Sequence, residues 1–188
     1  MTGELTRVVA GAMAVFIALI FLRAAIHKLA DPDRFRGILA DYGLLPEPAL
    51  PLMRWAIPAL EGITAGALMW QGSRPLGAWL GVGLLLTYGA AISVNLLRGR
   101  SEIDCGCGGA PEPLSPTLVA RNLGLAAAAA PAALGKAPLV TSAEVLTSWA
   151  LAGVAMLCWG AAEQAMVNAA RISAYRREAL TWLPGATS

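Results

Sequence analysis

Five apolar segments constrain this chain most, because each is long enough to cross a bilayer as a helix. The third of them, 75–97, contains no charged residue, and the first contains an uncharged run from Val8 to Leu22. Lipid offers no water to an unpaired backbone group, so segments of this length cross it as helices. We therefore predict an all-α, integral membrane helical bundle with spans at about 5–26, 49–70, 75–97, 118–134 and 145–162.

The composition agrees with a membrane protein. Of the 188 residues, 57% are hydrophobic and 14% are charged, whereas soluble domains are about half apolar and about a quarter charged. This balance excludes a disordered chain, an ordinary soluble enzyme and a nucleic-acid-binding arm, so no nucleic acid partner is expected. We predict one transmembrane domain over 1–188, with a four-helix core, a fifth transmembrane helix and a polar C-terminal tail at 168–188.

Small residues recur four apart inside the predicted spans. Ala14 and Ala18 form one such pair, and Gly62 and Gly66 form another. Such spacing lets helix backbones approach closely in lipid. The pattern predicts a closely packed bundle.

The first long loop, 30–48, contains the pattern of a short amphipathic helix. Asp31 and Pro32 provide an N-cap and a first-turn proline, and Gly43 can end the helix. The apolar residues between them, at helical spacing, are Phe35, Ile38, Leu39 and Tyr42. We predict a short interfacial helix, which either covers a site at one end of the bundle or lies on the membrane surface without that role.

The second long loop, 99–116, contains two cysteines separated by one glycine, Cys105 and Cys107. Two thiols this close can form a disulfide, and the surrounding glycines allow the tight bend that it needs. A disulfide that closes so short a loop stabilises the fold little. A strained, exposed disulfide is also readily reduced. We therefore favour a redox-active pair with Cys105 and Cys107 as the catalytic residues.

Other uses of these cysteines remain open. The pair could bind a soft metal ion such as Cu(I) with two thiolates, or it could be two inert thiols. A structural zinc site requires four ligands, which this sequence does not bring together, so zinc is not expected and no metal ligands are assigned. Cys158 lies within the fifth predicted span, where we expect it to pack as a small hydrophobic residue.

The basic residues divide unequally between the two ends of the predicted bundle. Of the 14 Lys and Arg residues, Arg7, Arg74 and Lys136 lie at the N-terminal end, and the other eleven lie at the cysteine end. The positive-inside rule would place the cysteines in the cytoplasm. Several of these cations lie inside spans rather than in loops, however, and a functional cluster of cations would distort this count. The side of the cysteine loop therefore stays open.

Several of these cations are candidate site residues. Arg23 and His27 are four apart and share a helix face. The other polar residues near the same membrane face are Arg54, Asn95, Arg121 and Asn122. A cationic pocket there would stabilise a nearby thiolate and could hold an anionic substrate or a reduced quinone. Headgroup contacts are the alternative for these arginines.

Glu61 is the acidic residue placed deepest in a predicted span. An ionisable group at that depth is expected to face the bundle interior and to have a partner. Arg23, Lys28 and Arg121 are the candidates. We favour an ion pair that sets helix register; the alternative is a proton carrier, a role that His27 could share.

Many of these residues belong to motifs through which the sequence resembles the MauE family, within the wider DoxX-like group of membrane proteins. The resemblance covers about 8–135, and its most specific part is 98–109. The matching motifs are Lys28-Leu29, Phe35, Tyr42-Gly43-Leu44-Leu45-Pro46, Pro58-Ala59-Leu60-Glu61, Asn95 to Arg100, Ile103 to Gly109, Leu114-Ser115 and Arg121-Asn122.

The resemblance implies a role in maturing methylamine dehydrogenase, a thioredoxin-like (MauD-like) redox partner outside the cytoplasm, and a multi-pass location in the bacterial inner membrane. The plan is also similar to DsbB and vitamin K epoxide reductase, which pass electrons between cysteines and a quinone, although this is an analogy of architecture alone. No cofactor is certain from the sequence, and a quinone is the candidate.

The leading hypothesis is a membrane thiol–disulfide oxidoreductase. The alternatives are transport or handling of soft metal ions through the same cysteines, and a non-catalytic membrane assembly factor. The supporting site residues that we predict, in addition to the cysteines, are Lys28, Glu61, Arg98, Arg100, Arg121, His27 and Arg23.

Overall fold

The computed structural model describes residues 2–107, 112–134 and 139–181. Within these residues the chain is helical, with one isolated β-bridge and no β-strand. The prediction of an all-α membrane bundle is confirmed. The elements are α1 (Thr2–Ala30), α2 (Pro32–Tyr42), the 3-10 helix η1 (Glu47–Ala49), α3 (Leu50–Met69), α4 (Arg74–Leu97), α5 (Pro116–Ala133) and α6 (Ser142–Thr181).

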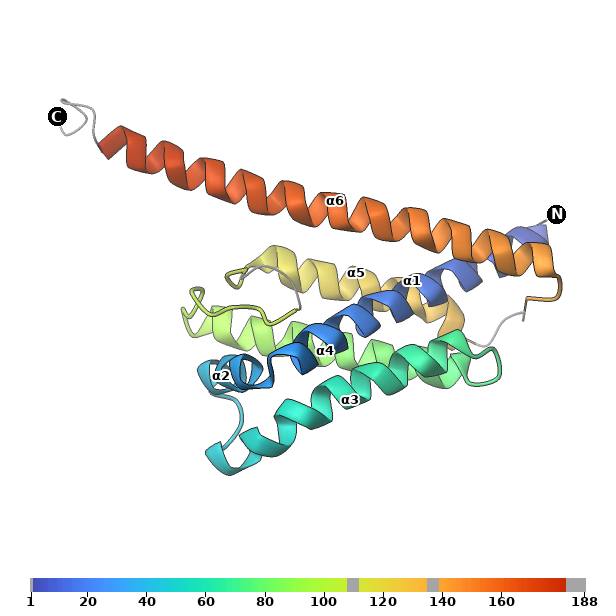
Figure 1. Ribbon diagram of the computed structural model, residues 1–188, viewed down its shortest axis with the longest axis horizontal. Coiled ribbons are helices and arrows are strands. Elements are labelled where there is room, and N and C mark those ends of the chain that lie inside the picture. The colour runs from blue at the N-terminus through green and yellow to red at the C-terminus, as the bar shows by residue number, and fades with distance from the viewer. Residues whose placement is uncertain (1, 108–111, 135–138, 182–188) are drawn as a thin grey trace.

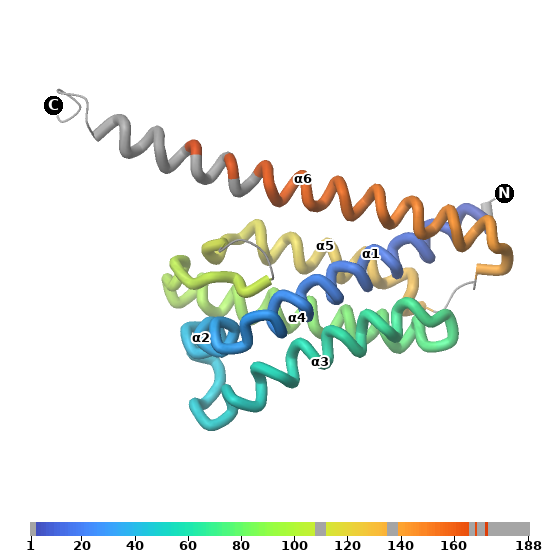
Figure 2. The backbone as a smooth tube through the Cα atoms, in the orientation of Figure 1, coloured from blue at the N-terminus to red at the C-terminus, as the bar shows by residue number. Residues whose placement is uncertain are grey.

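Four helices form the core of the bundle, and a fifth long helix packs outside it (Figure 1). Contacts join α1 to α3, α3 to α4, α4 to α5 and α5 to α1, which closes a ring of four helices, and α6 packs along α1. Figure 2 shows that α2 and the loop after α4 lie at one end of the ring, while the N-terminus and the α3–α4 connection lie at the other. The cysteine loop and α2 therefore share one end of the bundle.

Three described helices are long and apolar enough to cross a membrane: α1, α4 and α6. The other two predicted spans are present as helices but are less apolar. α3 contains Arg54 and Glu61, and α5 has only 18 residues, among them Arg121 and Asn122. A helix of 18 residues is about 27 Å long, slightly short of a typical hydrocarbon core.

α6 extends well beyond the span predicted at 145–162. It has 40 residues, so the segment predicted as a polar tail from residue 168 continues as helix to Thr181. Its membrane-length segment is only 11% buried in the bundle, and Cys158 on this helix is exposed. Cys158 does not pack among the bundle helices, because α6 contacts the bundle along α1 and leaves most of its surface uncovered. That it acts as a small hydrophobic residue on an apolar span stays a prediction.

The predicted close packing through small residues is confirmed at one of its two sites. Ala14 and Ala18 on α1 are fully buried in the main core, among side chains of all four ring helices. A methyl group added at Gly62 or Gly66 would meet no atom within 4 Å. The interpretation of these two glycines as helix contacts is wrong, because they face away from the neighbouring helices.

Among the described glycines, the closest approach to a neighbouring backbone is at Gly77 of α4. A Cβ atom there would lie 2.6 Å from the backbone nitrogen of Leu68 and 2.8 Å from the carbonyl carbon of Ala67 on α3. We expect Gly77→Ala to lower the free energy of unfolding by about 1–3 kcal/mol, because the backbone of α3 would have to move away. Gly83→Ala on the same helix is the control.

A Cβ atom at Gly83 meets nothing within 4 Å, and alanine favours a helix interior over glycine by up to about 1 kcal/mol. Equilibrium unfolding in mixed micelles should therefore show opposite signs for the two variants. Equal stabilisation of both would contradict the close contact between α3 and α4.

The predicted short helix of the first loop is present as α2. The Asp31 carboxylate accepts a hydrogen bond from the Arg34 backbone nitrogen at 3.0 Å, as an N-cap does. Gly43 ends the helix in the left-handed conformation, with φ of 58°. The amphipathic spacing then directs Phe35 into the protein, where its side chain is buried.

Candidate functional site

The site is built around the loop between α4 and α5, where Cys105 and Cys107 are joined by a disulfide. Backbone bonds hold the loop in place: the Cys105 nitrogen donates to the Glu112 carbonyl at 2.8 Å. The Asp104 carboxylate accepts from the backbone nitrogens of Gly106 and Glu112, both at 3.2 Å, and from the Arg34 guanidinium at 2.9 Å. The pair is therefore presented by an ordered loop that is tied to α2.

Gly106, between the cysteines, adopts a left-handed backbone conformation and lies too close to α2 for a side chain to fit without a shift. Its φ is 68°, and a Cβ atom would lie 3.0 Å from the Cγ2 atom of Ile38 on α2. We expect Gly106→Ala to lower the free energy of unfolding by about 1–3 kcal/mol, because it adds a contact with α2 to the left-handed strain.

Gly99→Ala is a matched control for this substitution. Gly99 has the similar φ of 72°, but a Cβ atom there meets nothing within 4 Å. Thermal unfolding should show a larger loss for Gly106→Ala than for Gly99→Ala. Equal losses of stability for the two variants would mean that Ile38 of α2 does not contact Gly106 closely.

Tyr42, at the end of α2, makes a second contact with the cysteine loop. Its hydroxyl donates a hydrogen bond to the Cys105 carbonyl at 3.2 Å. Burial, and secondarily the negative charge of Asp104, raise the pKa of Tyr42 to about 12. The hydroxyl therefore stays protonated, and remains a donor, across the physiological pH range.

The two cysteines have different surroundings. Cys105 is 8% exposed and packs in a small apolar cluster with Ile92, Leu114 and Leu118, whereas Cys107 is exposed. The Arg121 Nη2 atom lies 3.7 Å from the Cys105 sulfur, and its Nη1 atom lies 3.3 Å from a Glu112 carboxylate oxygen. A guanidinium group is thus placed beside the buried sulfur.

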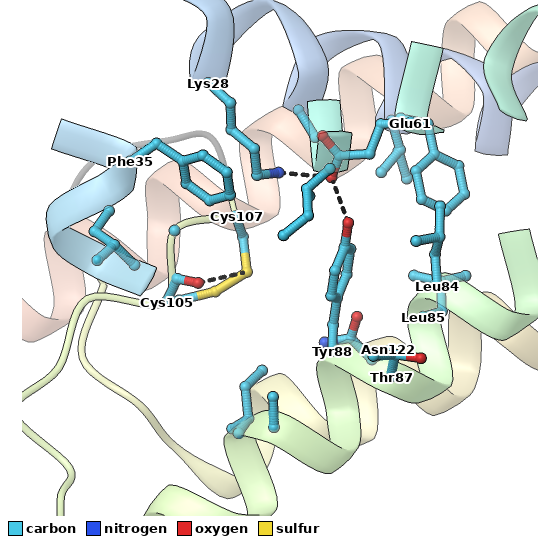
Figure 3. Close-up of a pocket in the computed structure, with 18 of the residues that line it drawn as sticks. Lys28, Phe35, Glu61, Leu84, Leu85, Thr87, Tyr88, Cys105, Cys107 and Asn122 are labelled. Carbon is cyan, nitrogen blue, oxygen red and sulfur yellow. Dashed lines mark hydrogen bonds and ion pairs between the residues drawn. A yellow bond between two sulfur atoms is a disulfide. The ribbon is translucent and has the colours of Figure 1, made fainter. Parts of the chain in front are cut away.

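The disulfide forms part of the wall of a cavity of about 410 Å³ inside the bundle. Figure 3 shows the disulfide and the polar side chains of Lys28, Glu61 and Tyr88 around this space. α2 closes one end of the cavity with Phe35 and its neighbours. The apolar lining includes Ile20, Phe21, Ala24, Phe35, Ile38, Leu39, Leu44, Leu45, Met53, Ile57, Leu84, Leu85, Ala91, Ile92, Leu125 and Trp159.

A buried ion pair lies in the wall of this cavity. The Lys28 ammonium lies 2.6 Å from Oε1 of Glu61, and the Tyr88 hydroxyl donates to the same oxygen at 2.9 Å (Figure 3). Lys28 is 7% exposed and Glu61 is fully buried. The ammonium also lies over the Phe35 ring, 5.4 Å from its centroid. Of the three candidate partners for Glu61, the structure selects Lys28.

The second carboxylate oxygen of Glu61, Oε2, has no hydrogen-bond partner among the described residues. A buried polar atom without a partner costs free energy, so such atoms are uncommon. Glu61 lines the cavity. The cavity therefore has an apolar body, with Lys28, Glu61 and Tyr88 forming a polar group in its wall.

Charged residues close the side of the cavity toward α6. Glu163 on α6 lies 2.6 Å from the Arg23 guanidinium and 3.9 Å from the Arg121 guanidinium. The indole nitrogen of Trp159 donates to the same carboxylate at 2.9 Å. Glu163 thus links α6 to both α1 and α5 beside the cysteine loop.

The structure brings together most of the predicted site residues. Lys28, Glu61, Arg121 and Arg23 all line the cavity with the two cysteines. Arg54 lies at the same end of the bundle but points away to a surface pair with Asp33, at 2.6 Å.

Three predicted residues lie elsewhere. His27 is exposed and lines a separate hollow of about 50 Å³, next to Asp104. Arg98 and Arg100 are exposed and do not line the main cavity. Arg100 donates instead to the Asp41 backbone carbonyl at 3.4 Å. Arg100, at the start of the cysteine loop, therefore lies against the end of α2. Spacing in the sequence could not predict this contact.

Sequence reasoning assigned no role to three polar residues that shape the site: Tyr88, Asp104 and Glu163. Tyr88 had no distinguishing pattern of its own, whereas Asp104 belongs to the motif Ile103 to Gly109 but was given no role. Glu163 follows Trp159 by four residues at the end of an apolar span, a signal that could have suggested a carboxylate paired with a neighbouring helix. Among the described residues, no three His, Cys, Asp or Glu side chains gather in a group that could bind a metal ion.

Comparison with known proteins agrees with the motifs in the sequence. The family model for methylamine utilisation protein MauE matches residues 6–135, which is most of the chain and includes the cysteine loop. A methylamine utilization protein MauE from Paracoccus denitrificans is 37% identical over 126 residues, covering 66% of this chain and 68% of that protein.

A second relative extends the match further along the chain. The methylamine utilization protein MauE of Methylorubrum extorquens is 39% identical over 147 residues, covering 76% of this chain and 78% of that protein. No solved structure matches this chain. The family model covers α1 to α5 and ends before α6. The chain therefore belongs to the MauE family of methylamine utilisation proteins.

Proposed function

We propose that this protein is a membrane thiol–disulfide oxidoreductase in which the Cys105–Cys107 disulfide exchanges with a thioredoxin-like protein. One observation carries the proposal: the disulfide lies between an exposed surface and an apolar cavity, with a guanidinium group at its buried sulfur. A nearby cation stabilises a thiolate, and a thiolate is both the attacking and the leaving group in disulfide exchange. A purely structural disulfide has no need of this setting.

The family gives the proposal a biological context. The relatives carry the name methylamine utilization protein. We propose that exchange serves the maturation of methylamine dehydrogenase, with a MauD-like protein as partner and a multi-pass location in the bacterial inner membrane. The apolar helices α1, α4 and α6 support the membrane part of this proposal.

The cavity fits a lipid-soluble quinone as the electron acceptor. Its volume of about 410 Å³ and its apolar lining suit a substituted ring. The Lys28 ammonium has three N–H donors and gives one to Glu61, so it could donate another to a ring carbonyl oxygen. When bound, a quinone accepts two electrons and two protons.

Filling the cavity should prevent this binding. Ala91 lines the cavity, whereas its neighbour Ala90 is exposed and does not. In nanodiscs, we expect Ala91→Trp to lower the affinity for a short-chain benzoquinone by at least about tenfold, since a displaced ring loses more than about 1.4 kcal/mol of contacts. Titration calorimetry measures the affinity without depending on activity.

Ala90→Trp is the control and should bind the quinone as the unaltered protein does. Circular dichroism should show the same helix content in both variants. Equal affinity in all three proteins would place the quinone elsewhere and would remove the cavity from the proposal.

Trapping a covalent intermediate tests the exchange itself. A variant with one remaining cysteine of the pair cannot resolve a mixed disulfide, so it should accumulate one. We expect Cys105→Ser, which keeps the exposed Cys107 thiol, to be recovered from cells as a disulfide with a thioredoxin-like protein that mass spectrometry identifies. The variant with both serines is the control and should recover none.

The outcome in cells also separates catalysis from assembly. If the variant with both serines still supports methylamine dehydrogenase maturation and neither single variant captures a thioredoxin-like protein, the chain is a non-catalytic assembly factor. The exchange proposal would then be abandoned.

A further inference from the structure

The cysteine pair has one accessible and one inaccessible end. Cys107 is exposed, whereas Cys105 is 8% exposed and packs against Ile92 and Leu118. A thiol carried by a folded protein can reach only a sulfur at the surface. The described surface therefore offers Cys107, and not Cys105, to such a partner.

The surroundings of Cys105 suit a leaving group. The Arg121 Nη2 atom lies 3.7 Å from its sulfur, and the Tyr42 hydroxyl holds its backbone carbonyl at 3.2 Å. The leaving thiol departs faster when its thiolate is stabilised. The positive charge of Arg121 would provide that stabilisation at Cys105, in an apolar setting where it acts more strongly than in water.

We propose, building on the exchange function above, that the two sulfurs have separate roles: a partner thiolate attacks Cys107, and Cys105 leaves as a thiolate beside Arg121. Arg121 is then a positioning and charge-stabilising residue for one sulfur of the pair. Cys107 is then the sulfur that faces the partner. The sequence did not determine which of the two cysteines is attacked.

The step balances in bonds and electrons. The partner sulfur forms a bond with the Cys107 sulfur while the Cys105–Cys107 bond breaks, and the electron pair of that bond stays on Cys105. A second thiolate of the partner then attacks the partner's own sulfur in the mixed disulfide and releases Cys107 as a thiolate. The partner dithiol has become a disulfide, and Cys105 and Cys107 have become the dithiol.

Reduced glutathione is the probe that tests this assignment in the intact, oxidised protein. Glutathione is added in nanodiscs, the reaction is stopped with acid after short intervals, and free thiols are then alkylated. Tandem mass spectrometry locates each group on the peptide that contains both cysteines. We expect glutathione on Cys107 and the alkyl group on Cys105.

The single variants provide an independent reading. With oxidised glutathione, Cys105→Ser, which keeps the exposed thiol, should form its mixed disulfide at least about tenfold faster than Cys107→Ser, which keeps the buried one. A faster reaction at Cys105, or glutathione found mainly on Cys105 in the oxidised protein, would overturn the assignment and leave the exchange function intact. No adduct on either cysteine would overturn both.

Arg121 variants test the leaving-group role. We expect Arg121→Gln to slow the attack of glutathione on the oxidised protein by about tenfold, and Arg121→Lys to recover part of that loss, because lysine keeps the charge. The matched control is Arg100→Gln, since Arg100 lies outside the cavity at the same end of the bundle. Equal rates for Arg121→Gln and Arg121→Lys would overturn the role of the charge.

Discussion

Replacing Lys28 by methionine is expected to lower the free energy of unfolding by about 3–5 kcal/mol, the cost of breaking a buried ion pair from one side. Lys28 and Glu61 are 2.6 Å apart, and both are buried. The substitution leaves the Glu61 carboxylate in an apolar wall, with the Tyr88 hydroxyl as its remaining donor. Equilibrium unfolding in mixed micelles measures the change.

Two controls make this expectation specific. The double variant Lys28→Met with Glu61→Leu should recover most of the lost stability, because it removes the stranded charge as well. The Asp33 side chain is 84% exposed and pairs with Arg54 at the surface. Asp33→Asn removes this pair and should change the free energy of unfolding by less than about 1 kcal/mol. A loss below about 1 kcal/mol for Lys28→Met would show that water reaches the pair.

Replacing either cysteine of the pair by serine is expected to abolish catalysed oxidation of a dithiol. In vesicles that contain the oxidised protein and a quinone, the oxidation of dithiothreitol should fall to the rate of empty vesicles for Cys105→Ser and for Cys107→Ser. Neither variant can form the intramolecular disulfide that accepts the electrons. The absorbance of the oxidised dithiol follows the rate.

Cys158→Ser is the matched control for these two variants. Cys158 is exposed on α6, and it is the free cysteine among the described residues. We expect this variant to oxidise the dithiol at the unaltered rate. A large loss for Cys158→Ser would instead make that thiol part of the exchange path, and full activity of Cys107→Ser would contradict the proposed function.

The helices could be predicted from the sequence because their signals are local. Runs of apolar residues define α1, α4 and α6, and the Asp31 cap and Gly43 define α2 within a residue or two. The end of α6 could not be predicted in this way. Its apolar run ends near residue 162, but helix formation does not require an apolar side chain, and the backbone bonds continue to Thr181.

The site was predicted in part. Two neighbouring cysteines in a glycine-rich loop are a chemical signal that needs no fold, and an acidic residue inside an apolar span requires a partner wherever it lies. The partner of Glu61 is Lys28 rather than Arg23 or Arg121. This pairing depends on how α1 and α3 are rotated against each other, and the spacing of residues in the sequence does not determine that rotation. The exposed position of Cys158 likewise follows from the contact of α6 with α1.

The sequence by itself determined that this chain is a helical membrane protein of the MauE family with one close cysteine pair, since apolar length and adjacent thiols are properties of the covalent chain. The tertiary structure alone decided that the disulfide borders a cavity, that Glu61 pairs with Lys28 in its wall, and that Cys105 is buried beside Arg121 while Cys107 is exposed. Burial and charge at a sulfur atom come from residues far away in the chain, and only packing brings them together.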